Sequence, residues 1–153
     1  HCISVDPWFL VGDFPDLTPL IHTARNVNDR MPAYVYGRIR EIMHEHGIAD
    51  LSKVGLYGLT YKEDVDDTRE SPTLQLLELI GEKGSGAPLV YDPFIHSDLV
   101  PHQVHDFDSF LNESELVVIM VGHSEIRNAL GKLAGKVVLD TRNICTKDEA
   151  YKL

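Results

Sequence analysis

The chain has 153 residues, 43% of them apolar, which is enough for one ordinary hydrophobic core. Its 14 basic and 24 acidic residues give a formal charge of −10, which argues against nucleic acid or an anionic membrane as the main partner. No apolar run approaches the roughly 18 residues that span a bilayer and no signal peptide is recognisable, so we expect no membrane partner and a cytoplasmic protein.

Residues 1–47 are predicted to be helical. Asp6 is placed to cap a first helix with Pro7 in its first turn, and Thr18 followed by Pro19 is typical of a second helix start. Cys2 and Cys145 are too few for a disulfide framework, and a bridge between them is an alternative that we do not favour.

An apolar stripe follows the second helix start, with residues recurring at steps of three or four. Pro32 interrupts the stripe and should kink or split the helix, because proline removes a backbone hydrogen bond. An ordinary core helix would explain the pattern, but the length of the stripe favours burial against a partner chain. The members of the stripe are Leu20, Ala24, Val27, Met31, Val35, Ile39 and Ile42.

Residues 48–153 alternate short apolar runs with helical patterns. This alternation predicts an α/β fold, a doubly wound parallel-sheet (Rossmann-like) domain with helices on both faces. We expect a helix over 71–82, with an apolar inward face, and a shorter helix after Ser124. The strands are predicted at residues 54–60, 89–91, 116–121 and 137–140.

A dinucleotide fingerprint, G-x-G-x-x-G between a strand and a helix, does not occur in this sequence. Gly55 and Gly58 fall within a predicted strand, whereas Gly84 and Gly86 precede a strand rather than a helix. The usual phosphate-binding turn of an NAD site is therefore not expected in this chain.

Cys2 is followed four positions later by Asp6, and this pair is the first candidate for chemistry. The thiol could act as a nucleophile, and the carboxylate could manage a proton or a water beside it. By itself the pair is weak evidence, because a free cysteine is usually a small buried hydrophobe and Asp before Pro often starts a helix.

A second motif, V-G-L-Y-G-L-T-Y-K-E-D-V-D-D-T-R-E-S-P at 54–72, changes that assessment. Together with N-D-R-M-P at 28–32, Y-D-P-F at 91–94 and D-T-R-N at 140–143, it resembles the UDP-glucose/GDP-mannose dehydrogenase family of nucleotide-sugar 6-dehydrogenases. The resemblance runs over essentially the whole chain. It implies NAD-dependent oxidation of a sugar CH2OH group to a carboxylate, a four-electron reaction.

The resemblance also implies a division of the chain. Residues 1–47 would hold the catalytic cysteine loop and central dimerisation helices, and residues 48–153 would bind the UDP-sugar. In this family the NAD-binding domain lies on the N-terminal side of the cysteine, so we expect this chain to be the C-terminal part of the enzyme. We therefore expect no turnover by the chain alone, and a steady NADH signal from it would contradict that.

Four further roles follow from the same resemblance. Cys2 would add to the aldehyde formed by the first oxidation, and the resulting thioester would be cleaved by water. Asp6 would help to activate that water, a role compatible with capping a helix. Lys62 would contact the nucleotide sugar beside Tyr61, and Arg69 would meet the pyrophosphate of NAD through its planar guanidinium.

Each of these cations also has an ordinary explanation. Lys62 and Arg69 follow a predicted strand end, where doubly wound sheets bind ligands, but such residues are more often simply solvated. Asp66 and Asp67 could orient Arg69 or cap the helix that follows. Arg142, expected to touch the nucleotide, could instead pair with its neighbour at position 140.

The histidines give a weaker signal. Pairs at 44 and 46 and at 102 and 105 could bind a metal, but no cysteine or carboxylate set at ligand spacing accompanies them, so surface histidines are the favoured interpretation. His123, just past a predicted strand end, is the one histidine singled out for a role in a site. Its alternative is a capping or loop residue.

The substrate is suggested by departures from the UDP-glucose pattern. Enzymes of that branch usually have Phe-Pro-Lys between the cysteine and the aspartate, where this chain has Ile3, Ser4 and Val5. The surrounding residues look more like the UDP-N-acetyl-sugar branch, which favours UDP-N-acetylmannosamine. A non-catalytic UDP-sugar-binding and dimerisation module stays open, although it would have no use for a nucleophilic thiol next to Asp6. Another NAD-linked oxidoreductase acting on a simple alcohol would not explain the cysteine.

Overall fold

The structure is a computed structural model, and it describes residues 5–84, 86–146 and 150–153. Its centre is a five-stranded parallel sheet in the order β2-β1-β3-β4-β5. Leu56 in β1 pairs with Val90 on one side and Val118 on the other. The predicted doubly wound α/β fold is thus confirmed. The strands are β1 (Val54–Tyr57), β2 (Leu89–Tyr91), β3 (Leu116–Ile119), β4 (Val137–Asp140) and β5 (Tyr151–Lys152).

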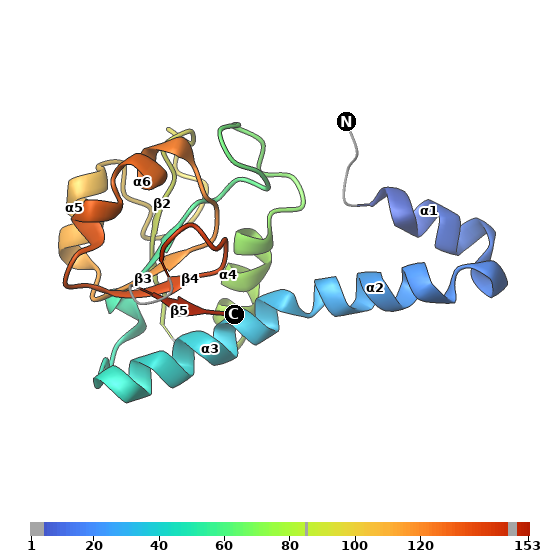
Figure 1. The fold of residues 1–153 in the computed structure, drawn as a ribbon, viewed down its shortest axis with the longest axis horizontal. Coiled ribbons are helices and arrows are strands. Elements are labelled where there is room, and N and C mark those ends of the chain that lie inside the picture. The colour runs from blue at the N-terminus through green and yellow to red at the C-terminus, as the bar shows by residue number, and fades with distance from the viewer. Residues whose placement is uncertain (1–4, 85, 147–149) are drawn as a thin grey trace.

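Helices cover both faces of the sheet (Figure 1). α3 (Met31–His46) and α4 (Pro72–Glu82) pack on one face, where Leu116 and Val118 of β3 point. α5 (Phe107–Glu113) and α6 (Ser124–Asn128) pack on the other, against Val117 and Ile119. Because successive strand residues face opposite ways, the all-apolar run of β3 fills two cores at once. Three 3-10 turns complete the described elements: η1 (Pro15–Leu17), η2 (Leu51–Lys53) and η3 (Leu130–Leu133).

The N-terminal helices extend from the sheet domain as an arm. α1 (Asp6–Asp13) folds back beside α2 (Pro19–Asp29), and α2 runs on toward α3 in Figure 1. The predicted interruption at Pro32 is confirmed, since α2 ends at Asp29 and Pro32 stands in the first turn of α3. Proline is favoured there because the first helical N–H groups have no intrahelical acceptor.

The predicted capping by Asp6 is wrong. Val5 is the N-cap residue of α1, and its carbonyl accepts from the N–H of Trp8, so Asp6 already lies in the first turn. Thr18 does stand at the N-cap of α2, but its hydroxyl donates to the carbonyl of Phe14 at 2.8 Å and makes no capping bond.

The apolar stripe has two different environments. Its second half is buried in the chain's own core, with Val35, Ile39 and Ile42 packed against the sheet from α3. Its first half is exposed, with Leu20 80% and Val27 60% accessible. Burial against a partner chain can therefore concern only the part of the stripe that precedes α3. Among the described residues, no helix has the length and apolar character needed to cross a bilayer.

Candidate functional site

The loops after β1 and β3 meet at the carboxyl edge of the sheet. The chain leaves β1 through α4 to reach β2 on one side, and it returns through α5 to β3 on the other side of β1. This reversal creates a topological switch point between β1 and β3. In open α/β sheets, ligands bind in the crevice outside the carboxyl ends of the strands at such a point.

His123 lies at the centre of this edge, and its side chain is fully buried. Its Nδ1 accepts a hydrogen bond from the N–H of Asp64 at 2.9 Å. The ring proton therefore belongs on Nε2, which faces Asp92 Oδ2 at 3.2 Å and Thr60 Oγ1 at 3.3 Å. One imidazole thus joins the loops that follow β1, β2 and β3. His123 is also the N-cap residue of α6, as the alternative interpretation expected, but its side chain is buried and makes no capping hydrogen bond.

Asp92 is the anionic partner of that histidine. Its carboxylate accepts from the N–H groups of Leu59 at 2.6 Å, Thr60 at 3.1 Å and Phe94 at 2.8 Å, in addition to His123. Burial alone would raise the pKa of Asp92, but the hydrogen bonds from His123, Phe94 and Leu59 outweigh it and hold the pKa below its usual value. The residue is therefore a buried, ionised anchor.

The loop between β1 and α4 is fixed to α6 by a second carboxylate. Asp64, in a left-handed conformation with φ 57°, accepts from Ser124 N at 2.8 Å and from Ser124 Oγ at 2.5 Å. These hydrogen bonds lower the pKa of Asp64. Glu63 adds an ion pair to Arg127 at 2.9 Å. The segment that carries Tyr61 and Lys62 is thereby held across the switch point.

Lys62 and Arg142 are the two predicted substrate cations, and both are exposed. In the part of the chain that the structure describes, neither side chain has a hydrogen-bond or ion-pair partner. The proposed Arg142–Asp140 pairing is wrong at the level of the side chain. Asp140 accepts from the backbone N–H of Arg142 at 2.9 Å, and its ionic partner is Lys152 at 2.6 Å.

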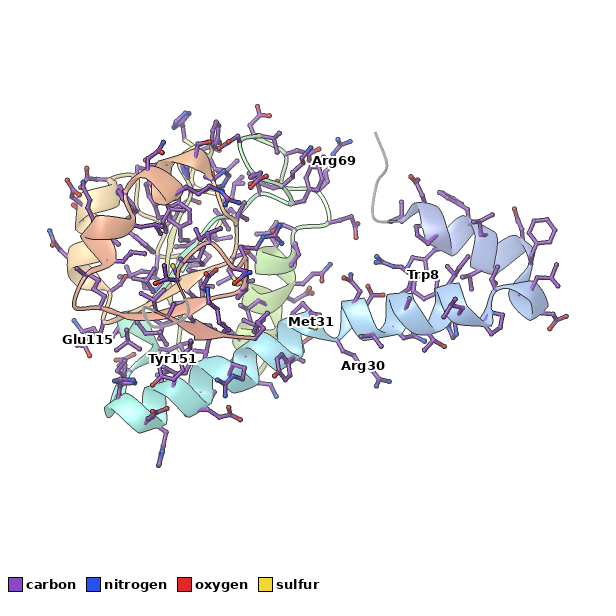
Figure 2. All side chains as sticks on the ribbon, in the orientation of Figure 1. Trp8, Arg30, Met31, Arg69, Glu115 and Tyr151 are labelled. Atoms are coloured by element: carbon purple, nitrogen blue, oxygen red, sulfur yellow. The ribbon has the colours of Figure 1, made fainter. Side chains whose placement is uncertain are left out.

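Arg69 projects from the same loop as Lys62, on its outer side (Figure 2). Its guanidinium forms a two-point contact with Asp67, from Nε at 2.9 Å and from Nη2 at 2.6 Å. Hydrogen bonds from Arg69 lower the pKa of Asp67 to about 2. The expected orientation of Arg69 by Asp67 is confirmed, whereas the cap of α4 is Ser71, whose hydroxyl accepts from the N–H of Thr73.

The described residues do not make a complete dinucleotide site. β1 ends at Tyr57 and α4 begins only at Pro72, so no tight glycine turn brings a helix N-terminus to the strand end. Arg69 offers one exposed cation for a pyrophosphate. Asp6 is exposed in the first turn of α1, and Cys2 lies outside the described residues.

One histidine of each predicted pair contacts another side chain. His46 lies 2.8 Å from the hydroxyl of Tyr151, and His105 lies 2.7 Å from Asp98. Throughout residues 5–84, 86–146 and 150–153, no group of three His, Cys, Asp or Glu side chains is placed to hold a metal ion.

Comparison with known proteins defines the class. Residues 55–147 match the family model described as "UDP-glucose/GDP-mannose dehydrogenase family, UDP binding domain", so the chain belongs to this family. The match includes the loops just described and the strands from β1 to β4 except Val54, whereas β5 lies beyond it.

Individual proteins are similar to this chain over nearly its whole length. Over 97% of its own length, the chain is 35% identical to the UDP-N-acetyl-D-mannosamine dehydrogenase of Methanocaldococcus jannaschii. Over 94% of its own length, it is 33% identical to the NDP-N-acetyl-D-galactosaminuronic acid dehydrogenase of Ralstonia nicotianae. It spans 35% and 34% of these proteins, respectively. Among solved structures it matches the UDP-N-acetyl-mannosamine dehydrogenase of S. aureus, with a TM-score of 0.77 and 34% identity over 99% of this chain and 37% of that one.

Proposed function

We propose that this chain is the UDP-sugar-binding and thiol-bearing part of an NAD-dependent nucleotide-sugar 6-dehydrogenase. Its substrate would be a UDP-N-acetylhexosamine, with UDP-N-acetylmannosamine favoured. The observation that carries the proposal is the match to the UDP-binding domain over 55–147, in a domain whose carboxyl edge presents Lys62 and Arg142. The names of the relatives support the choice of an N-acetylated sugar.

UDP recognition rests on a few local cations. The chain carries a formal charge of −10, so a diphosphate needs positive side chains close at hand. Lys62 and Arg142 emerge after β1 and β4, at the same edge of the parallel sheet, and their charges are not neutralised by described carboxylates. The His123 and Asp64 contacts hold the Lys62 loop before ligand arrives, which reduces the ordering cost of binding.

The chemistry is assigned to Cys2. Its sulfur adds to the carbon of the aldehyde left by the first oxidation and gives a thiohemiacetal. Loss of a second hydride turns this adduct into a thioester, and water then releases the carboxylic acid and the free thiol. NAD, held by another part of the enzyme, would supply the hydride acceptor for both oxidations, and Arg69 would contact its pyrophosphate. Asp6 would assist the hydrolytic water.

Dimerisation is part of the same proposal. The exposed part of the stripe on α2, which includes Leu20 and Val27, would be buried in a homodimer. A monomeric mass at micromolar concentration would contradict this assignment.

Binding of UDP is expected to weaken about 10- to 100-fold in Lys62→Ala, because one charge-assisted contact to the diphosphate is lost. Calorimetric titration with UDP measures this. Lys53→Ala is the matched control, since Lys53 is also exposed but lies just before β1, at the opposite edge of the sheet. Equal affinities of wild type and Lys62→Ala would remove Lys62 from the site.

Oxidation is tested in the enzyme with its NAD-binding part present. NADH formation should be seen with UDP-N-acetylmannosamine, and Cys2→Ala should reduce formation of the acid by roughly 10³-fold or more. UDP binding without any NADH formation would favour the non-catalytic module. Oxidation of UDP-glucose with no activity toward UDP-N-acetylmannosamine or UDP-N-acetylglucosamine would overturn the substrate assignment.

A further inference from the structure

A cleft of about 370 Å³ lies between the N-terminal helices and the sheet domain. Trp8 of α1 reaches toward α2, and Met31 stands at the junction of α2 and α3 (Figure 2). Arg25 and Asn28 of α2 line the same cleft, as does Tyr61 from the loop after β1. The cleft therefore combines an aromatic and an apolar wall with hydrogen-bond donors.

Arg25 supplies the unusual feature of this cleft. Only 19% of its side chain is exposed, and its Nη2 donates to Asp29 Oδ1 at 2.8 Å, which fixes the guanidinium on α2. Its Nε is buried and has no hydrogen-bond partner among the described residues. A buried donor left unpaired is costly and uncommon in folded proteins. Because Nε has almost no accessible surface, a ligand oxygen in the cleft would pair with it after neighbouring side chains move aside.

The position of the cleft indicates which part of a ligand would enter, and this step rests on the proposed function. Tyr61 adjoins Lys62, the cation assigned to the diphosphate. Val5, also in the lining, is three residues from Cys2 in the sequence, and three residues of chain span at most about 11 Å. A substrate that joins the diphosphate site to the thiol must place its hexose near this cleft.

We propose that Arg25 is a specificity-determining residue that recognises the acetamido group of a UDP-N-acetylhexosamine. Its Nε–H donates to the acyl oxygen, and the acetamido methyl lies against Trp8 and Met31. Asp29 keeps the guanidinium in place, and the edge-on contact between Trp8 and His22, with ring centroids 5.7 Å apart, holds the indole. A UDP-hexose without the acetamido group would leave the Nε donor unpaired.

The test compares Arg25→Leu and Arg25→Lys with wild type in the enzyme that contains its NAD-binding part. Both variants should lose about 10- to 100-fold in kcat/KM for the UDP-N-acetylhexosamine and in its calorimetric affinity, because both lack the Nε–H. The affinity for UDP and any residual activity with UDP-glucose should change less than about 3-fold. Arg30→Leu is the matched control, since Arg30 points away from α1 in Figure 2 and should behave as wild type.

The possible results distinguish a failure of the Arg25 role from a failure of the proposed function. An equal loss for acetylated and non-acetylated sugars, with UDP affinity intact, would show that Arg25 does not read the acetamido group. Full activity in Arg25→Lys would assign the effect to charge and overturn the role of Nε. A lowered melting temperature with a loss of UDP affinity in both variants would make Arg25 a structural residue and overturn the inference. A wild-type enzyme that neither binds UDP nor oxidises any UDP-sugar would refute the proposed function itself.

Discussion

Replacement of Asp92 by alanine is expected to lower the free energy of unfolding by about 3–5 kcal/mol. The carboxylate accepts hydrogen bonds from the N–H groups of Leu59, Thr60 and Phe94 and from His123 Nε2. Its removal would leave these buried donors without an acceptor, and each unpaired donor costs about 1–3 kcal/mol before relaxation and water entry reduce the sum. Urea denaturation, with the midpoint and slope fitted separately, measures the loss.

Asp98→Ala is the matched control for this change. The Asp98 carboxylate also bonds a histidine, His105, but its side chain is 81% exposed, so we expect a change below about 1 kcal/mol. The loss of unfolding free energy in Asp92→Asn should lie between those of Asp92→Ala and Asp98→Ala. The amide keeps one acceptor oxygen but turns its NH2 donor toward the other N–H groups. A loss in Asp92→Ala no larger than that in Asp98→Ala would show that the hydrogen bonds to Asp92 do not stabilise the fold.

Asp92 should also make the free energy of unfolding decrease as the pH falls into the acid range. Because the pKa of Asp92 is lower in the folded chain than in the unfolded one, the unfolded chain binds more protons in the acid range. The contribution of Asp92 is complete above the unfolded value of about 4 and is lost as the pH falls through the lower folded value. Asp92→Asn should therefore show a shallower acid-induced loss of stability than wild type.

Strand starts were predicted correctly from the sequence, but two strand ends were placed too late. The predictions 54–60 and 116–121 compare with observed strands Val54–Tyr57 and Leu116–Ile119. The residues that follow stay apolar and buried, as Leu59 and Val121 do, so hydrophobicity alone continues the strand. The backbone ends it earlier, because Gly58 turns to φ 100° and the N–H of Val121 bonds to the Tyr57 carbonyl. β5 (Tyr151–Lys152) was not predicted, since two residues carry no periodicity.

The edge of the sheet that carries the candidate site could be predicted from the sequence. The hydrogen bonds among the residues of that site could not. Lys62 and Arg142 were proposed from the family resemblance and from their positions after predicted strands, and the structure leaves both exposed. Asp92 was missed although it stands in the quoted Y-D-P-F motif, because Asp before Pro is typical of a turn. A signal was available: Asp92 directly follows β2, and His123 comes within four residues of the end of β3. Their contact depends on a crossover that no local pattern encodes.

Gly58→Ala is expected to destabilise the fold by about 3–5 kcal/mol, from two separate causes. The residue has φ 100°, where a side chain is strained, and an added Cβ would lie 2.5 Å from the Val121 Cβ and 2.9 Å from the Val121 backbone nitrogen. Gly81→Ala, in the last turn of α4 with nothing within 4 Å, is the control and should stabilise by up to about 1 kcal/mol. Both are measured by urea denaturation, and similar midpoints for the two variants would contradict this account.

The backbone around Gly58 cannot move aside to relieve the contact. Its N–H donates to the Tyr91 carbonyl at 2.7 Å, and its own carbonyl accepts from Thr73 Oγ1 at 2.8 Å, so the peptide is held from β2 and from α4. Val121 must therefore yield. In a double-mutant cycle, Val121→Ala should recover the part of the loss due to the close contact and leave the part due to φ, so that the double variant is more stable than the sum of the single changes predicts. Strict additivity would mean that the cost of Gly58→Ala is conformational alone. Because Lys62 follows four residues later, a shift here should also weaken UDP binding in Gly58→Ala but not in Gly81→Ala.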